Sequence, residues 1–238
     1  MIPIRGIPEL EKGDDLGALV VGAAPGFEED DVLVVAQKAV SKVEGRVVDL
    51  AEVVASQRAV ELAAGTDPRR LEVILREARD VVRARPPLVI AETRHGFVCA
   101  SAGVDASNAK GPDTLVLLPL DPDASAAGLR ERIRELTGAQ IGVVVSDSFG
   151  RAWRRGTTDV ALGVAGLPAL VDLDGQKDSA GYELHATQIA VADEIAGAAQ
   201  LVMGKLDGIP AAIVRGLRVR GDGRGSDLVM PRERDLFR

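Results

Sequence analysis

Apolar runs alternate with polar, turn-forming stretches along this chain. The two most continuous runs, residues 31–37 and 141–146, predict strands that are buried on both faces, as in a sheet covered by helices. Shorter apolar segments predict further strands at residues 2–5, 88–91, 97–100, 114–118 and 211–214. Because a turn containing Gly96 separates the segments at 88–91 and 97–100, we expect these two strands to form a hairpin.

Helices are predicted where apolar residues recur every three or four positions. The aspartates at 14 and 15 can cap a helix that begins at Leu16. Asp67 and Pro68 can begin a second helix, and apolar residues with helical spacing follow them as far as Val82. We expect this helix to last until the prolines at 86 and 87. Further helices are predicted at residues 125–137, closed by Gly138, and at about 187–203, closed by Gly204.

These elements predict a mixed α/β (α+β) fold with mixed sheets and flanking helices. We find no repeat of fixed period and no Pro/Ser-rich linker, so composition places no domain boundary within residues 1–238. The glycine-rich segment 221–226 follows no long strand. It is therefore interpreted as a loop and not as a nucleotide-binding fingerprint.

Composition excludes several classes of protein. The chain has 238 residues, of which 46% are hydrophobic but only 3% aromatic, and its formal net charge is −7. A nucleic-acid binder normally has a basic balance and stacking aromatics, so we expect no nucleic-acid partner. Cys99 is the only cysteine, which excludes an internal disulfide, and no apolar stretch is long enough for a membrane span. We expect a cytoplasmic protein that has no membrane partner.

The richest candidate chemistry follows the predicted strand at 141–146. Asp147 and Ser148 are oxygen donors suited to Mg²⁺ or Mn²⁺, and the arginines from Arg151 onward suit phosphate or carboxylate groups. Ligands bind beyond the carboxyl ends of strands in open α/β sheets, so this position favours a site. The alternative is an aspartate that caps a turn among solvated arginines.

Two further clusters follow predicted strands. Asp105 and Asn108 lie among small residues, where Asp105 could be a second metal carboxylate or the pair could form an Asx turn. Lys38 and Lys42 could neutralise phosphate charge, or could belong to a solvated basic loop. Lys205 follows the Ala-rich helix, where it could bind a ligand or complement the helix dipole.

Five motifs stand in order along the chain: residues 6–9 with 13–16, then 37–46, 102–108, 146–154 and 191–194. The third motif has the sequence Ala-Gly-Val-Asp-Ala-Ser-Asn, and the fourth has Ser-Asp-Ser-Phe-Gly-Arg-Ala-Trp-Arg. In order and spacing, over nearly the whole chain, they resemble the coenzyme F-420-0:L-glutamate ligase family.

The resemblance implies a γ-glutamyl ligase that uses GTP to join L-glutamate to coenzyme F-420-0. It also implies two divalent cations, Mg²⁺ or Mn²⁺, and leaves K⁺ open as a further cation. The fold implied is an unusual one, with two intertwined sub-domains per subunit and a homodimer. Some relatives have an additional C-terminal flavin-binding domain, but this chain stops at Arg238, so we expect a single catalytic unit, 1–238.

Individual residues take on roles through the same resemblance. Asp105, Asp147 and Ser148 correspond to metal ligands, with Ser148 in a position where the family usually has threonine. Asp105, Asp147 and Arg151 are the predicted catalytic residues. The predicted GTP contacts are Ile7, Pro8, Glu9, Leu10, Gln37, Lys38, Lys42, Asn108, Met203, Gly204, Lys205, Leu206 and Gly208.

Two other functions stay open at this stage. A ligase that acts on a different carboxylate acceptor would share most of these motifs, because acceptor contacts are the least readable part of the sequence. A non-catalytic module that binds a nucleotide or a deazaflavin would keep the glycine-rich contacts. Such a module would not need both metal carboxylates, so the joint presence of Asp105 and Asp147 favours the enzyme.

Overall fold

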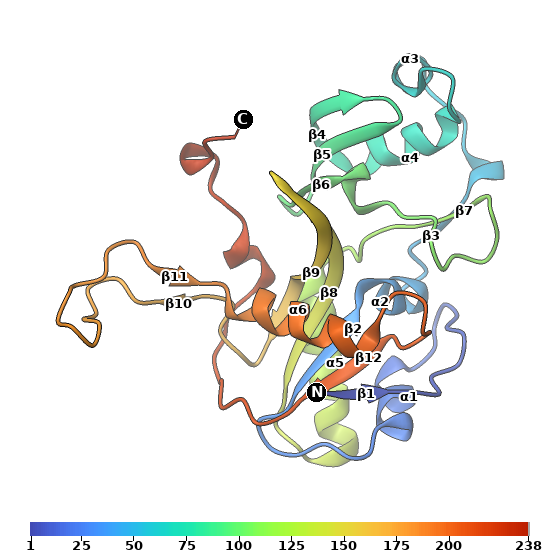
Figure 1. Cartoon of the computed structure of the whole chain (residues 1–238). Helices are drawn as coiled ribbons and strands as arrows, with labels where there is room; N and C mark the ends of the chain where they lie inside the picture. Colours follow the sequence, from blue (N-terminus) through green and yellow to red (C-terminus); the bar gives the residue numbers. More distant parts are fainter. Residues whose placement is uncertain (238) are drawn as a thin grey trace.

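The computed structural model describes residues 1–237. Its centre is a five-stranded sheet with the strand order β1-β12-β2-β8-β9 (Figure 1). The strands are β1 (Ile2–Ile4), β2 (Val32–Ala36), β8 (Gly142–Arg151), β9 (Arg154–Ala165) and β12 (Ala211–Val214). β2 and β8 are parallel, and the other pairs in this sheet are antiparallel.

The valine runs form the middle of this sheet, as predicted. β2 pairs with β8 from Val32 opposite Gly142 to Ala36 opposite Ser146, and Val34 and Val144 are fully buried. β-Branched side chains suit a strand that packs on both faces, because their restricted rotamers lose little entropy there. β2 ends at Ala36 beside Ser146 of β8, which brings the start of α2 next to Asp147 and Ser148.

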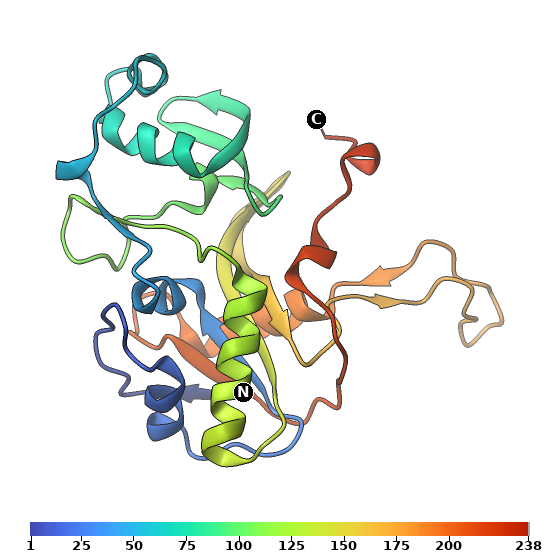
Figure 2. The same cartoon turned by 180° about the vertical axis from the view of Figure 1, so that it is seen from behind.

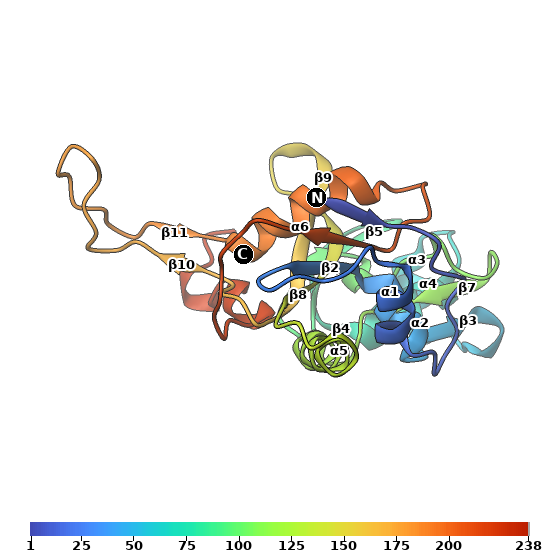
Figure 3. The same cartoon turned by 90° about the horizontal axis from the view of Figure 1, so that it is seen from below.

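Helices cover both faces of the sheet (Figure 3). One face packs against α1 (Leu16–Ala23), α2 (Gln37–Val43) and α5 (Pro122–Thr137), and the other against α6 (Val191–Met203). The predicted caps are confirmed: the Asp15 carboxylate accepts from the Ala18 amide at 3.0 Å, and Asp67 caps the helix that begins at Pro68 in the same way. Gly138 ends α5 in the left-handed region, and Gly204 ends α6. Among residues 1–237, no helix combines the length and apolar character that a membrane span needs.

A smaller group of elements lies between α2 and α5 in sequence (Figure 2). A sheet of β4 (Ala78–Arg85), β5 (Leu88–Thr93) and β6 (Val98–Ala100) packs against α3 (Gln57–Ala63) and α4 (Pro68–Glu77). β3 (Val47–Asp49) pairs with β7 (Thr114–Val116), and together they connect this group to the central sheet. β5 and β6 are antiparallel, so the predicted hairpin around Gly96 is confirmed.

The prediction of one helix from Pro68 to Val82 was wrong beyond Glu77. α4 ends there, and residues 78–85 form β4, in which Val81 pairs with Ala91. The valines and arginines at these positions fit the repeat of a helix as well as that of a strand. The strand is favoured because pairing with β5 provides hydrogen-bond partners for the backbone N–H and C=O groups. A periodic pattern alone could not distinguish these two arrangements.

Other boundaries also differ from the predicted ones. β8 continues to Arg151, so Asp147 and Ser148 lie within a strand that turns back into β9. α5 begins earlier, at Pro122, and α6 begins later, because Gln188–Ile189 form β11, which pairs with β10 (Val171–Asp172) in a protruding ribbon (Figure 1). The remaining elements are short 3-10 turns at Leu50–Glu52, Ser101–Gly103, Gly225–Leu228 and Arg232–Arg234.

The glycine-rich tail has a packing role. Gly221, Gly223 and Gly225 lie against the backbone of residues 162–169, and a methyl group added at Gly223 would meet the Ala169 nitrogen at 2.2 Å. Only glycine allows such close approach of two chain segments. The loop prediction for this segment is therefore confirmed up to Gly225, where a short 3-10 turn begins.

Candidate active site

A cavity of about 230 Å³ opens where β2 ends beside Ser146 of β8. Its walls come from the loop before α1, the start of α2, the loop before β7, the β8–β9 hairpin and the loop after α6. The lining residues are Ile7, Pro8, Glu9, Leu10, Ala36, Gln37, Lys38, Ala39, Lys42, Asn108, Ser146, Asp147, Ser148, Asp159, Met203, Gly204, Lys205, Gly208, Ile209 and Pro210.

Asp147 is one of the carboxylates that line this cavity. No salt bridge reaches it from any of residues 1–237, and burial raises the pKa of its carboxyl to about 6. The Ser148 amide and the Lys38 ammonium oppose this shift, whereas the nearby carboxylates of Asp105 and Asp159 add to it. An Asp in this setting is poised to bind a cation, because a cation would offset both the burial and the like charges.

Ser148 and Asp159 face each other on adjacent strands. The Ser148 hydroxyl donates to one Asp159 carboxylate oxygen at 2.6 Å, and the Ser146 hydroxyl lies 3.2 Å from the other. Gln200 of α6 contacts both residues. Its amide oxygen accepts from the Asp159 backbone N–H at 3.1 Å, and its amide nitrogen lies 3.4 Å from the Ser148 oxygen. These contacts orient the Ser148 hydroxyl so that its proton points to Asp159.

Lys38 connects the cavity to the second predicted carboxylate. Its ammonium nitrogen lies 2.6 Å from an oxygen of Asp105 and 2.6 Å from the Ser107 hydroxyl. Burial alone would raise the pKa of Asp105, but the hydrogen bond from Lys38 and those from Ser107 hold it below its ordinary value. Asp105 does not line the cavity itself, and it contacts the lining through Lys38.

The other predicted cations have different surroundings. Lys42 forms a salt bridge to Glu9 at 2.6 Å, so it links α2 to the loop before α1. Lys205 is exposed, lines the cavity, and forms no salt bridge with any residue of 1–237. The Gln37 side chain is buried and donates to Ser41 and to the Leu117 carbonyl, so it holds α2 in place. The alternative of a solvated basic loop was therefore wrong, since Lys38 and Lys42 lie on a helix, and the phosphate contacts of these lysines stay a prediction.

The oxygen donors fit a hard divalent cation. Asp147 offers a carboxylate with no salt bridge to residues 1–237, Ser148 an oriented hydroxyl, and Asp105 a second carboxylate close enough to influence the first. Residues 1–237 contain no compact group of three or more His, Cys, Asp or Glu side chains arranged for a metal. Mg²⁺ and Mn²⁺ do not require one, because they commonly keep water and substrate phosphate oxygens as ligands.

Most of the predicted site residues meet at this one cavity. The exceptions are Asp105, which lies behind Lys38, and two residues outside the lining. Leu206 is 95% exposed, and Arg151 lies at the exposed end of the hairpin, where it donates to the Arg155 carbonyl. Their predicted contacts with GTP and substrate stay predictions.

Sequence reasoning missed Asp159. The residue is 7% exposed and lines the cavity opposite Ser148. A single aspartate before Val160 and Ala161 gives no local signal, because its role depends on the pairing of β9 with β8. Recognition of the hairpin turn after Arg151 would have placed it.

Comparison with known proteins gives a consistent result. The family model described as F420-0:Gamma-glutamyl ligase matches residues 5–216. The chain is 44% identical over 237 residues to a protein of Methanocaldococcus jannaschii named coenzyme F420:L-glutamate ligase, covering 98% of this chain and 94% of that one. It is 46% identical over 238 residues to a protein of the same name from Methanopyrus kandleri, covering 97% and 94% of the two chains.

Proposed function

The chain belongs to the F-420-0:gamma-glutamyl ligase family, and we propose that it joins L-glutamate to coenzyme F-420-0 with GTP as the phosphoryl donor. The observation that supports this most directly is the cavity, which gathers metal-type oxygen donors and lysines from five separate parts of the chain. The relatives of this chain that are named coenzyme F420:L-glutamate ligase align with it over nearly their whole length.

The proposed reaction has two steps. An oxygen of the terminal carboxylate of F-420-0 attacks the γ-phosphorus of GTP, the bond to the bridging oxygen breaks, and GDP leaves. The neutral amine of L-glutamate then attacks the acyl carbon of the resulting acyl phosphate, and an amide bond forms as phosphate leaves. The extra proton of the amine passes to solvent. Activation is needed because a carboxylate is a poor electrophile.

The acidic side of the cavity would hold two divalent cations. Asp147, Ser148 and Asp105 are the proposed ligands, and Asp159 is proposed to orient the Ser148 oxygen by accepting a hydrogen bond from its hydroxyl. Bound Mg²⁺ or Mn²⁺ would neutralise charge on the phosphoryl group during transfer. The chain supplies a rigid arrangement of oxygens, so little reorganisation is needed when the substrates arrive.

The basic side of the cavity would bind the phosphates. Lys205 has no carboxylate partner among residues 1–237 and can turn toward an anion at little cost. Lys38 lies between Asp105 and the cavity, where it can exchange one oxygen partner for another. Positioning and charge neutralisation are the main sources of catalysis in phosphoryl transfer.

A substrate panel tests the assignment. Purified protein with Mn²⁺ is given GTP or ATP, L-glutamate, and either F-420-0 or another small molecule with a terminal carboxylate, and the products are separated by chromatography and weighed. We expect glutamyl addition with GTP and F-420-0. Ligation to a different acceptor only would assign another substrate, and GTP binding without any ligation would indicate a binding module.

A further inference from the structure

The β8–β9 hairpin extends well beyond the cavity. Ser148 and Asp159 form its base, and the pairing continues through Gly150 opposite Thr157 to Arg151 opposite Arg154. Residues 150–157, here called the hairpin tip, are all exposed. In both Figure 1 and Figure 2 the tip lies beside the C-terminal segment, away from α2. One continuous hairpin therefore joins the cavity to a distant exposed surface.

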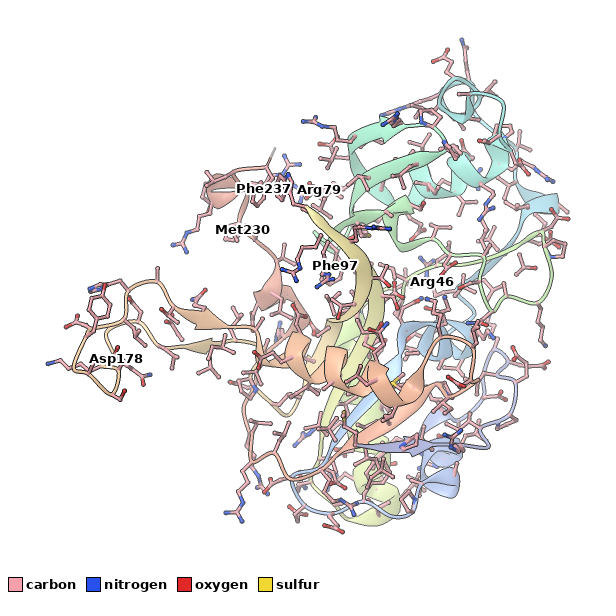
Figure 4. All side chains as sticks on the ribbon, viewed as in Figure 1. Arg46, Arg79, Phe97, Asp178, Met230 and Phe237 are labelled. Carbon is pink, nitrogen blue, oxygen red and sulfur yellow. The ribbon has the colours of Figure 1, made fainter. Side chains whose placement is uncertain are left out.

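The tip holds the chain's only tryptophan in an unfavourable position. Trp153 is 80% exposed and has a φ of 55°, in the left-handed region that bulky side chains rarely adopt. Its ring contacts Phe237, itself 70% exposed, with 4.7 Å between ring centroids (Figure 4 labels Phe237). Such a position adds nothing to the core, and strained residues of this kind gather at ligand sites.

The charges around Trp153 point to an anionic ligand. Arg151, Arg154 and Arg155 form no salt bridge with any residue of 1–237, and the Arg151 side chain donates to the Arg155 carbonyl at 3.0 Å. Three arginines within five residues of one hairpin turn therefore have no carboxylate partner among residues 1–237. Guanidinium groups beside an exposed indole suit a planar aromatic molecule that also has a phosphate.

We propose that the hairpin tip binds the deazaflavin end of the acceptor, F-420-0. This inference rests on the proposed function, which sets the acceptor's terminal carboxylate beside Asp147. In F-420-0 a side chain with a phosphodiester joins the deazaflavin ring to that carboxylate. The ring would stack on Trp153, and the phosphodiester would pass the arginines of the tip.

The dimensions agree with this arrangement. From Asp147 to Arg151 the strand advances four residues, about 13 Å at the usual rise of a strand. The connecting chain of the acceptor has about ten bonds and spans roughly 12 Å when extended. GTP is expected on the opposite side, where α2 and the loop after α6 supply the predicted nucleotide contacts. The acceptor and the nucleotide would thus meet at Asp147 from two directions.

Binding can be measured without catalysis, because the deazaflavin is itself fluorescent. The anisotropy of F-420-0 is followed as protein is added, for wild type, Trp153→Ala and the double variant Arg154→Ala/Arg155→Ala. We expect each variant to weaken binding about tenfold, the order of one lost stacking contact. In wild type, Trp153 emission should be quenched as F-420-0 binds. Tyr182→Ala and Arg58→Ala, at exposed positions elsewhere, are the matched controls and should bind as wild type does.

Steady-state kinetics and sedimentation complete the test. The KM for F-420-0 should rise in Trp153→Ala while the KM for GTP stays the same. Unchanged affinity for F-420-0 in an active Trp153→Ala enzyme would refute the subsite and leave the proposed function standing. A Trp153→Ala protein that changes its oligomeric state would refute it too, because the tip would then be an interface between copies. If wild type ligates nothing, the proposed function fails, and the anisotropy series still decides the subsite.

Discussion

The Ser148 hydroxyl and the Asp159 carboxylate are joined by a 2.6 Å hydrogen bond across two adjacent strands. Asp159 has a second contact with Ser146, and Gln200 connects it to α6. The bond commits the Ser148 proton to Asp159, so an electron pair of the Ser148 oxygen stays available to a cation. The pair therefore explains why a buried carboxylate lies next to the proposed metal ligands.

Replacing Asp159 tests this relationship. Asp159→Asn should lower kcat about 10- to 100-fold, because groups that orient metal ligands have effects of this size. The affinity of the free protein for Mn²⁺, measured by calorimetry, should fall with it, whereas a purely structural role would change the melting temperature instead. Ser148→Thr should keep activity and Ser148→Ala should lose it. Wild-type kcat and Mn²⁺ affinity in Asp159→Asn would contradict the orienting role.

Asp147→Asn should remove turnover, by a factor on the order of 1,000, because a carboxylate that lines the cavity is lost. The fold should remain intact, and even become slightly more stable, since the burial that raises the pKa of Asp147 to about 6 penalises the charged form. Circular dichroism and thermal melting would be measured beside kcat. Full activity in a folded Asp147→Asn protein would contradict the metal role.

Gly223→Ala should destabilise the protein by about 1–3 kcal/mol, because the new methyl group would lie 2.2 Å from the Ala169 nitrogen. Gly128→Ala is the matched control: nothing lies within 4 Å of its added methyl group, and within α5 alanine should stabilise by about 0.5–1 kcal/mol. Urea unfolding would give both values. Equal effects of the two substitutions would show that the tail does not pack as described.

Glu72 predicts a pH effect on stability. Hydrogen bonds from Ser56, and then from Arg76, lower the pKa of Glu72 to about 2. A lowered folded-state pKa stabilises the protein above the unfolded value and loses this contribution as the pH falls toward the folded one. Glu72→Gln should therefore cost about 1–2 kcal/mol at pH 7 and progressively less as the pH is lowered from 4.5 toward 2.

The control for this pH series is Glu52→Gln, at an exposed position. Its unfolding free energy should stay close to that of wild type across the whole range. A Glu72→Gln deficit that does not shrink in acid would mean that packing, and not charge, explains the effect.

Several parts of the fold follow directly from local sequence. Continuous valine runs have few stable places other than the middle of a covered sheet, which is why β2 and β8 could be predicted. Asp15 and Gly138 could be predicted as helix caps because capping depends on only a few neighbouring residues.

The missed features depend on contacts between distant segments. Residues 78–82 form a strand only because β5 pairs with them, and Asp159 enters the cavity only because β9 folds back on β8. The ordered motifs nevertheless located most of the cavity lining, because five short segments together are more specific than any one. Arg151 and Leu206 show the limit of that reasoning, since closeness in sequence did not place them in the lining.

The central claim is tested most directly by phosphate release from GTP in the presence of Mn²⁺. F-420-0 and L-glutamate are added separately and together, and the mass of the coenzyme product is determined. We predict that full release requires both substrates and that the coenzyme gains glutamyl units in proportion to the phosphate released. Release that is independent of F-420-0, or a coenzyme whose mass does not change, would contradict the proposed ligase.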